Sequence, residues 1–559
     1  MSKFYLCFFV IIFTISVNAS ILNTKHNLSA SGTGNVTTTE TTRVCVFCHT
    51  PHNSNYEVPL WNKDSTTSVY VLYGSSTLSS AINQPDGTSR VCLSCHDGTI
   101  SVGSVKNPNV TFAMSNTNNG LLTGSSNLGT DLRNDHPVSF VPTLGSEINN
   151  PPVGDEVALD HSGKVQCTTC HNPHDDTYGY FLVKSNLNSA VCKTCHSKTG
   201  FEQSSHNLST ASWNGAGSNP WPKNFYSNVS DNACWNCHWS HGGTSNSFLL
   251  ANTPEENVCS VCHNGNVASK DIMSEFSKSS VHNVYAYTDI HDPIENITTM
   301  PAHVECLDCH NPHSVNSNTA TAPDVSGRLS NVKGADLSGN TVNPALYQYQ
   351  VCIKCHGTNL NINIAPFANR QVDTSNIRQA INPSNPSFHP IAGQGANNNV
   401  PSLKPPYSET SIIYCTDCHN NDNAVSTGGT GPEGPHGSIY PYLLEKRYEM
   451  SDYTPYSSSA YALCFKCHDP NVILSNSSTF GLHYRHIVRG QIPCSACHDP
   501  HGVPQGTATD GDHLGLINFD TNIVSPSNSG ILKFEVINGR GYCYLKCHGR
   551  NHDPLRYWR

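Results

Sequence analysis

The sequence predicts a fold made mostly of irregular loop, with short helices and few strands, in which repeated attachment sites replace a hydrophobic core. Three observations predict it. A short Cys- and His-containing motif recurs along nearly the whole chain, hydrophobic residues make up only 36% of the 559 residues, and 40 Gly and 34 Pro interrupt every apolar periodicity. Because such a composition normally favours disorder, the motifs must supply the cross-links that order the chain.

The repeated motif is seen clearly at Cys306-Leu307-Asp308-Cys309-His310, where two thiols lie three positions apart and a histidine follows the second. This is the attachment signature of c-type haem, in which both thiols bond the porphyrin and the histidine becomes the proximal ligand of the iron. The cysteine pairs are Cys45 and Cys48, Cys92 and Cys95, Cys167 and Cys170, Cys192 and Cys195, Cys234 and Cys237, Cys259 and Cys262, Cys306 and Cys309, Cys352 and Cys355, Cys415 and Cys418, Cys464 and Cys467, Cys494 and Cys497, and Cys543 and Cys547. The proximal histidines are His49, His96, His171, His196, His238, His263, His310, His356, His419, His468, His498 and His548.

Structural zinc and disulfides compete for these cysteines. A tetrahedral zinc site does not need a histidine directly after every second cysteine, and a disulfide needs no histidine at all. The twelve pairs use 24 of the 25 cysteines and leave only Cys7. The sequence therefore predicts twelve covalent haems, with one irregular copy at Cys543, where three spacer residues replace two.

The N-terminus and the charge balance limit the compartment and the partners. A basic start, an apolar run from Phe4 to Val17 and the small residues of Val17-Asn18-Ala19 predict a signal peptide over residues 1–19, so the protein is expected to be exported, either to the periplasm or outside the cell. No later stretch is long and apolar enough to span a membrane. The net charge of −10 and the absence of a basic patch argue against nucleic acid as a partner.

The motifs alternate between two kinds. In one kind a second histidine follows the proximal one by three residues, as in Cys45-Val46-Phe47-Cys48-His49-Thr50-Pro51-His52. We call the three residues after the proximal histidine, here Thr50-Pro51-His52, the arm. The other kind, as in Cys95-His96-Asp97-Gly98-Thr99, has no arm. This alternation resembles the doubled-CXXCH multihaem cytochromes c, and Lys25-His26-Asn27-Leu28-Ser29 is similar to secreted dodecahaem members from metal-reducing bacteria. The resemblance implies a multihaem cytochrome c fold organised around a closely packed haem chain, and some such proteins polymerise into extracellular filaments.

The sixth ligand of each iron is expected to be a histidine. Eighteen histidines remain after the twelve proximal ones, whereas methionine occurs only five times. We expect each arm to reach the second haem of its own pair, which assigns His52 to the Cys92 haem, His174 to Cys192, His241 to Cys259, His313 to Cys352 and His501 to Cys543, with His436 serving Cys464 because Asp422 occupies the arm position there. Histidines upstream are expected to serve the first haem, namely His26 for Cys45, His136 for Cys167, His206 for Cys234, His282 for Cys306, His389 for Cys415 and His486 for Cys494.

Several of these choices have competitors. His161 competes with His136, His483 competes with His486, and both His291 and His303 compete with His282. A spare histidine such as His161, His303, His513 or His552 is otherwise expected to lie at the surface or to bond a propionate.

Bis-histidine iron has no open coordination position, so the sequence predicts an electron carrier and not an enzyme. The alternative is a multihaem reductase of nitrite, hydroxylamine or a sulfur oxyanion with one open haem. Expected partners are other redox proteins or extracellular electron acceptors, together with self-assembly into filaments.

Module boundaries and local elements are the weakest part of the sequence signal. We expect three haem modules over residues 20–215, 216–380 and 381–559, each holding four haems. Helices are expected near 440–449 and 461–467, and strands near 68–73 and 531–536.

Overall fold

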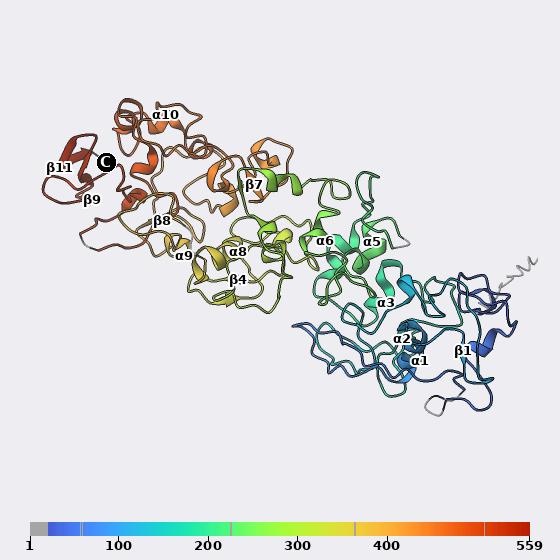
Figure 1. Cartoon of the computed structure of the whole chain (residues 1–559). Helices are drawn as coiled ribbons and strands as arrows, with labels where there is room; N and C mark the ends of the chain where they lie inside the picture. The colour runs from blue at the N-terminus through green and yellow to red at the C-terminus, as the bar shows by residue number, and fades with distance from the viewer. Residues whose placement is uncertain are drawn as a thin grey trace, which may run out of the picture. The chain divides into compact units, whose positions relative to one another are not determined.

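The computed structural model describes residues 21–55, 58, 60–223, 226–362, 365–507 and 509–558. The expected signal peptide and Cys7 lie outside these residues. The described chain is mostly irregular loop with short helices and small strand pairs (Figure 1), as the sequence predicts. Among the described residues, no helix has the length and the apolar character that crossing a membrane requires.

The helices are short because Gly, Pro and the motifs interrupt them, and the longest spans ten residues. In chain order they are α1 Gly87–His96, α2 Cys167–Cys170, α3 Ala190–Lys193, α4 Ser205–Leu208, α5 Val229–Asn232, α6 Glu256–Ser260, α7 Cys306–Cys309, α8 Gln348–Ile353, α9 Ile377–Ala380 and α10 Pro470–Ile473. Several of them coincide with a motif, and five further motifs form single turns at Val44–Phe47, Ala233–Asn236, Cys415–Asp417, Cys464–Lys466 and Cys494–Ala496. The motif is thus the main helix-forming unit of the chain.

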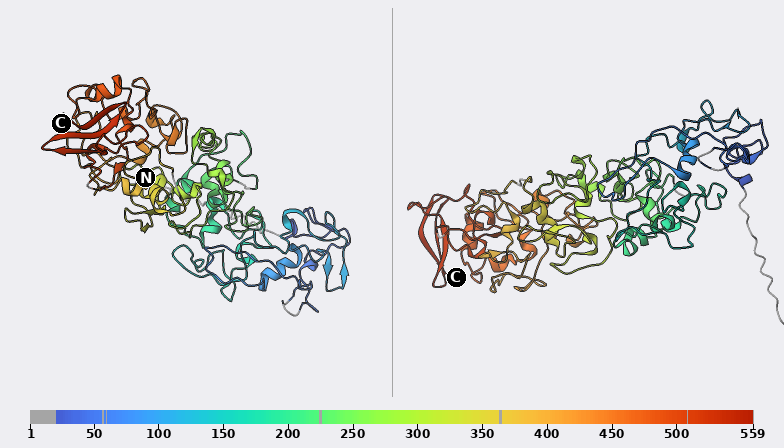
Figure 2. Two further views of the ribbon diagram at one scale, coloured as in Figure 1. Left: turned by 60° about the vertical axis from the view of Figure 1, so that its left-hand side comes forward. Right: turned by 90° about the horizontal axis from the view of Figure 1, so that it is seen from below.

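Most strands are two-residue pairs that fasten one loop to another. They are β1 Ser104–Val105 with β2 Val110–Thr111, β3 Ser280–Val281 with β7 Gly437–Ser438, β4 Gly334–Ala335 with β5 Thr341–Val342, and β6 Ser387–Phe388 with β8 Gly502–Val503, all antiparallel. The exception is the antiparallel sheet at the C-terminal end, where β10 Arg540–Cys547 lies between β9 Lys533–Ile537 and β11 Arg550–Trp558 (Figure 2).

Contacts divide the chain into two compact units. One consists of Met1–Ser197 and Cys237–Ala251, and the other of Lys198–Asn236 and Asn252–Arg559. Hydrophobic clusters in both are small, and the largest gathers six buried residues around Ile353 and Ile381. Neither the clusters nor the helices amount to the continuous core that a domain of this size normally has.

Local elements differ from the sequence expectation in three places. The stretch 440–449 contains only the turn Pro441–Leu443, because Tyr442 and Leu443 take left-handed backbone angles that end any helix. The stretch 461–467 contains only the turn at Cys464–Lys466. At 68–73 a single bridge, Val71 with Asp131, replaces the expected strand, whereas the strand expected at 531–536 is present as β9.

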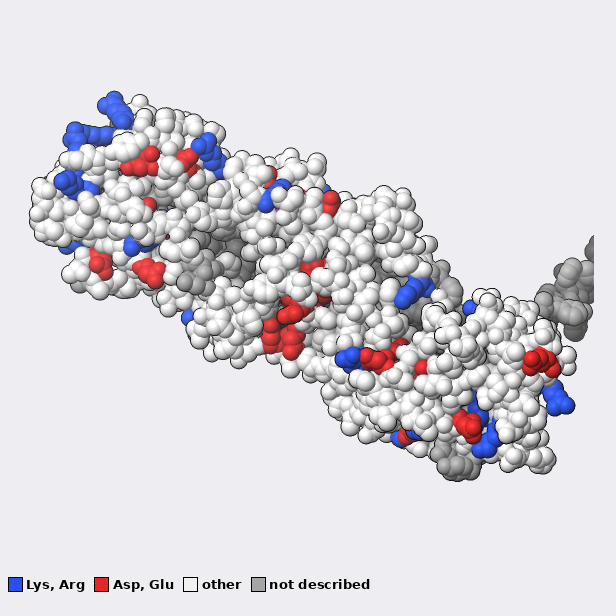
Figure 3. Space-filling view, viewed as in Figure 1, with Lys and Arg blue, Asp and Glu red and all other residues white. Residues whose placement is uncertain are grey.

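Charged side chains are few and dispersed. The face in Figure 3 is largely uncharged, with Lys, Arg, Asp and Glu in small separate groups. Such a surface offers no basic patch for nucleic acid on that face.

Candidate haem sites

In the regular motifs one helical turn carries the thiols and the histidine. The backbone N–H of the proximal histidine donates to the carbonyl of the first cysteine, for example from His310 to Cys306 at 3.0 Å and from His419 to Cys415 at 2.9 Å. A turn of this kind brings residues three and four apart onto one face. Both thiols and the imidazole are therefore presented to one side, as haem attachment requires.

The proximal imidazoles are oriented by a second hydrogen bond. Nδ1–H donates to a backbone carbonyl: from His171 to Tyr180 at 2.8 Å, from His238 to Phe248 at 2.7 Å, and from His419 to Tyr442 at 2.7 Å. His96, His310 and His498 are held in the same way by Ser126, Arg328 and Gly515. A bond at Nδ1 leaves the Nε2 lone pair available, which is the arrangement typical of a metal-ligating histidine.

The carbonyls that receive these bonds belong to a repeated turn that the sequence analysis missed. Tyr180, Phe248 and Tyr442 all have left-handed backbone angles, with φ of 51°, 59° and 62°. Such angles cost non-glycine residues roughly 1–3 kcal/mol and persist where the surroundings impose them. The signal was present in the sequence as an aromatic residue followed by two apolar ones, in Tyr180-Phe181-Leu182, Phe248-Leu249-Leu250 and Tyr442-Leu443-Leu444, each after an arm-bearing or equivalent motif.

At nine motifs the proximal imidazole faces the imidazole of a second histidine, with ring centroids 6.0–6.3 Å apart. The pairs, proximal residue first, are His49 with His174, His96 with His26, His171 with His241, His196 with His136, His263 with His206, His310 with His436, His356 with His282, His419 with His501, and His498 with His483.

This spacing fits one metal ion between the two rings. Imidazole nitrogen lies about 2.0–2.1 Å from a first-row metal such as zinc, so two trans imidazoles on one ion have centroids roughly 6.3 Å apart. Histidine rings packed by contact alone have no reason to keep this separation in every case. The observed spacing of the rings, together with the two thiols beside each proximal histidine, therefore fits a haem at each pair.

The histidines come together in a different order from the one expected. Four of the six arms face the first haem site of the preceding pair and not the second site of their own. His174 lies at His49 and not at the Cys192 motif, and the same shift holds for His241 at His171, for His436 at His310 and for His501 at His419. The upstream histidines shift correspondingly to the second site of the pair, with His26 at His96, His136 at His196, His206 at His263 and His282, in place of His313, at His356.

The reason for this order lies in the conformation of the arm. In Asn172-Pro173-His174 the Asn172 side chain accepts a hydrogen bond from the His174 backbone N–H at 3.0 Å, and Asp499 does the same for His501 at 3.2 Å. Such a turn, stiffened by proline, fixes where the arm points, and sequence spacing alone does not reveal that direction.

The same arm also positions a histidine of the neighbouring site. Nδ1–H of His26 donates to the carbonyl of Pro173 at 2.9 Å, and Nδ1–H of His206 donates to the carbonyl of Pro312 at 2.9 Å. His389 donates likewise to Pro500. The histidine of the arm faces the proximal ring of one site. The carbonyl of the proline before it accepts a hydrogen bond from a histidine that faces the proximal ring of the neighbouring site. One three-residue segment therefore contributes to two adjacent sites.

The pair at the Cys167 and Cys192 motifs varies this design. Its facing arm, Trp239-Ser240-His241, has no proline. His136 instead donates from Nδ1 to the carbonyl of Pro137 at 2.9 Å, and the buried Asp135 carboxylate lies 3.0 Å from Nδ1 of His241. At this site a carboxylate, in place of a backbone carbonyl, accepts the hydrogen bond from Nδ1 and orients the imidazole.

The remaining candidates are placed as follows. His52 is exposed, and its backbone carbonyl accepts from the Thr50 hydroxyl and the Asn107 amide. His483, in place of His486, faces His498. His389 lies near His468, His498 and His501, because after burial it contributes to lowering the pKa of each of these histidines. His161 is exposed, whereas His513 and His552 are buried and bond Ile517 and Tyr557.

The thiols show how successive sites follow one another within each unit. Between pairs, first cysteines meet: the thiols of Cys92 and Cys167 share a hydrogen bond, as do those of Cys259 and Cys306, and those of Cys352 and Cys415. Within pairs, second cysteines come close: after burial, the Cys95 thiol contributes to raising the pKa of Cys48 to about 12, and Cys195 and Cys467 act likewise on Cys170 and Cys418. These alternating contacts place the sites in sequence order.

The last motifs surround a large cavity of about 2060 Å³. Its lining includes most of the thiols and histidines between Cys352 and His548, set among Ile, Leu, Phe and Tyr side chains. A pocket for one small ligand measures about 300–1,000 Å³. The size, the apolar lining and the repeated thiols fit several porphyrins side by side.

Burial keeps the facing imidazoles unprotonated near neutral pH. Burial first, and neighbouring histidines second, lower the pKa to about 4 for His171, His263 and His356, and to about 3 for His436 and His483. A neutral imidazole is the form that binds iron, so the fold favours the ligating state.

The Cys543 motif departs from this geometry. It lies in the extended strand β10, and His548 follows with a φ of 48°. Its Nε2–H donates to both carboxylate oxygens of Asp452 at 2.9 Å, and Tyr453 stacks on the ring with a centroid distance of 4.2 Å. The nitrogen that is available in the regular motifs is occupied here.

Comparison with known proteins agrees with this geometry over part of the chain. The family model for the doubled CXXCH motif matches residues 161–201 and 227–268. No curated protein matches the chain. The match covers the Cys167, Cys192, Cys234 and Cys259 motifs, and the chain therefore carries the doubled motif of multihaem c-type cytochromes, which indicates covalent haem and electron transfer.

Proposed function

We propose that this protein is an exported electron carrier with twelve covalent c-type haems, most or all of them ligated by two histidines. The observation that supports it most strongly is the set of nine histidine pairs whose rings face each other at 6.0–6.3 Å beside two thiols. Bound haem would supply a one-electron Fe(III)/Fe(II) couple at each site.

The chain's own residues would perform three tasks. The thiols fix each haem, the two imidazoles fill both axial positions, and the carbonyl at Nδ1 sets the basicity of the imidazole. Because the thiols of successive motifs touch alternately within and between pairs, neighbouring cofactors would lie close together along each unit. This continuity is what a carrier needs and what a single-site enzyme does not.

The first arm supports assembly of copies in series as a refinement of this proposal. Four later arms, those of His174, His241, His436 and His501, face the site of an earlier pair, whereas His52 is exposed. An arm of this kind suits a site on another copy of the chain. Electron microscopy of the exported protein distinguishes filaments from separate particles, and a shortfall of filaments would remove this refinement while leaving the carrier function in place.

The proposal is tested by counting haems and examining their spin state. Intact mass combined with a pyridine haemochrome assay should give twelve haems per chain, and the ferric protein should be low-spin. A count well below twelve, or a predominantly high-spin spectrum, would contradict the proposal.

One observation favours a second candidate, the multihaem reductase with one open haem. His548 is engaged by Asp452, and the ring stacked on it is that of Tyr453 and not of a histidine. An iron at Cys543 with one free face could bind a small anion. A change in the spectrum on addition of nitrite or cyanide, accompanied by turnover, would support the reductase, and an unchanged spectrum would support the carrier.

A further inference from the structure

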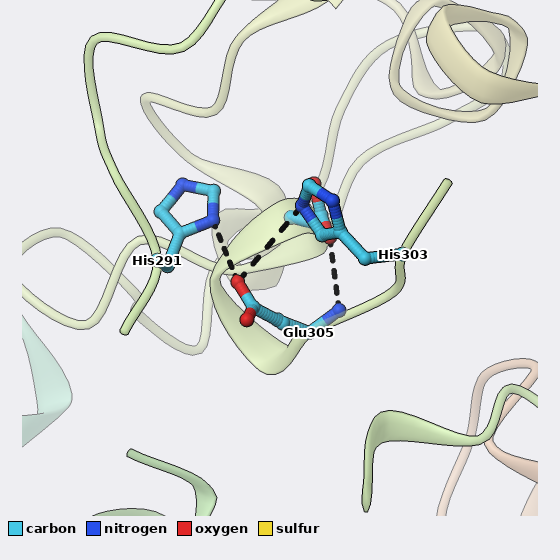
Figure 4. Close-up of side chains that lie close together, drawn as sticks. His291, His303 and Glu305 are labelled. Atoms are coloured by element: carbon cyan, nitrogen blue, oxygen red, sulfur yellow. Dashed lines mark hydrogen bonds and ion pairs between the residues drawn. The ribbon is translucent and has the colours of Figure 1, made fainter. Parts of the chain in front are cut away.

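Two histidines that face no motif form a separate cluster with buried carboxylates. His291, His303, Glu305 and Asp308 each offer one ligand atom, and these atoms all lie within 4.8 Å of one another. Figure 4 shows the His291 and His303 imidazoles on either side of the Glu305 carboxylate. The haem site beside them is already supplied, because His310 faces His436.

The distances within the cluster are close to those of a filled metal site. Nδ1 of His291 lies 3.1 Å from Oε2 of Glu305, Nε2 of His303 lies 3.7 Å from Oδ2 of Asp308, and Nε2 of His303 lies 4.0 Å from Oε2 of Glu305. Ligands of a tetrahedral zinc ion, with bonds of about 2.0–2.2 Å, are separated by roughly 3.3–3.6 Å. Because the four ligand atoms all lie within 4.8 Å of one another, shifts of up to about an ångström would close the site.

The orientation of His303 points to a ligand. Its Nδ1–H donates to the carbonyl of Pro301 at 2.9 Å, so Nε2 carries the lone pair. This Nε2 is buried and makes no hydrogen bond with the described residues, although the side chain is only 9% exposed. A metal-ligating histidine typically has this arrangement, in which a hydrogen bond at one ring nitrogen fixes the ring and directs the other, buried nitrogen toward the ligand site.

The charge balance points the same way. Besides Glu305 and Asp308, the neighbouring Glu255 and Glu256 are 5% and 1% exposed, and Glu295 Oε1 lies 3.5 Å from Nε2 of His303. Oε1 of Glu255 and both carboxylate oxygens of Glu256 are buried without a hydrogen bond from the described residues. Lys354, 3.2 Å from Asp308, is the nearby lysine. Burying so many carboxylates is costly unless cations compensate them.

From these observations we infer that His291, His303, Glu305 and Asp308 bind one divalent transition-metal ion of the zinc type. Two imidazoles with two carboxylates suit zinc, whereas calcium and magnesium take oxygen ligands. Glu305 directly precedes α7 and Asp308 lies within it, so the ion would fasten the loop that carries His291 and His303 to the Cys306 motif. Its charge would lie beside the junction at which the Cys259 and Cys306 thiols meet.

The test uses the full-length, haem-loaded protein. After dialysis against a chelator and addition of Zn²⁺ alone, elemental analysis should give one zinc for every twelve haem irons. The variants His303→Gln and Glu305→Gln should each lose this zinc and remain fully low-spin, because neither residue faces a motif histidine. The matched control His161→Gln changes an exposed histidine and should keep it.

Thermal unfolding provides the second measurement. Zn²⁺ should raise the melting temperature of the wild-type protein and of His161→Gln, but not that of His303→Gln. Wild-type protein that takes up no zinc, or variants that retain it, would overturn the site and would instead indicate a cluster of protonated histidines and carboxylates. The haem count is independent of this outcome, so failure here leaves the carrier function standing.

Discussion

The Cys306 motif and the Cys543 motif contain the same reactive groups in different backbones. Cys306 lies in a helical turn, where its two-residue spacer brings both thiols to one face. Cys543 lies in a strand, where Cys543 and Cys547, four residues apart, share a face but are separated by about 13 Å of extended chain. The strand therefore holds its two thiols farther apart than the helical turn does.

The two regions also differ in what stabilises them. Ala496, Phe519, Val524 and Leu545 form a buried cluster under the C-terminal sheet. Phe519, Val524 and Leu545 also line the large cavity that the sites from Cys352 onward surround. The difference lies in backbone pairing, because β9, β10 and β11 form one antiparallel sheet whereas the regular repeats are fastened by two-residue strand pairs.

Withholding haem should show this difference most strongly. In chain produced without haem attachment, we expect the regular repeats to lose amide protection completely, while β9–β11 keeps partial protection. Hydrogen exchange read by mass spectrometry measures both regions in one sample. Uniform protection along the apoprotein would contradict the contrast.

Acid should release ligands from the regular repeats. Burial lowers the pKa of His171, His356 and His501 to about 4, below the ordinary value of 6.5. Because the folded pKa is depressed, the stability that these groups contribute is complete above pH 6.5 and is lost as the pH falls toward 4. We expect a high-spin signal to grow over this range in a spectroscopic pH titration. A spectrum unchanged down to pH 3 would argue against histidine ligation.

Removing one attachment site at a time should show whether the two regions differ in their contribution to thermal stability. The double variant Cys543→Ser/Cys547→Ser should lose one haem mass and leave the other eleven low-spin. The matched double variant Cys494→Ser/Cys497→Ser should also lose one haem but melt at a lower temperature, because Ala496, which lies between its two cysteines, is fully buried in the C-terminal cluster. Equal melting temperatures would show that the two sites are equivalent.

The smallest expected effect concerns Asp452. If the iron takes Nε2 of His548 in the loaded protein, the ion pair with Asp452 is given up, and Asp452→Asn should change the unfolding free energy by less than about 0.5 kcal/mol. Chemical denaturation measures this. A loss of about 1.5–3 kcal/mol of unfolding free energy, as for a hydrogen bond to a charged group, would show that His548 keeps its hydrogen bond to Asp452. The twelfth iron would then lack His548 as its ligand.

Sequence reasoning predicted the loop-rich fold because motif and composition are local properties. It also named His26, His174 and His501 as residues of interest, since spacing marks them out. It could not predict which site each of them faces, because that depends on the turn at Asn172 or Asp499 and on the proline carbonyl that holds a neighbouring ring. The choice of His483 over His486 depends likewise on tertiary packing and not on any local pattern.

The account's central claim is that rings facing each other in the structure are axial pairs. Comparing His174→Ala with His52→Ala tests it most directly, because the two residues occupy equivalent arms and only His174 faces a proximal ring, that of His49. In the separated, unassembled protein we predict one new high-spin haem that binds carbon monoxide in His174→Ala and a fully low-spin spectrum in His52→Ala. A high-spin haem in His52→Ala together with an unchanged His174→Ala would contradict the claim.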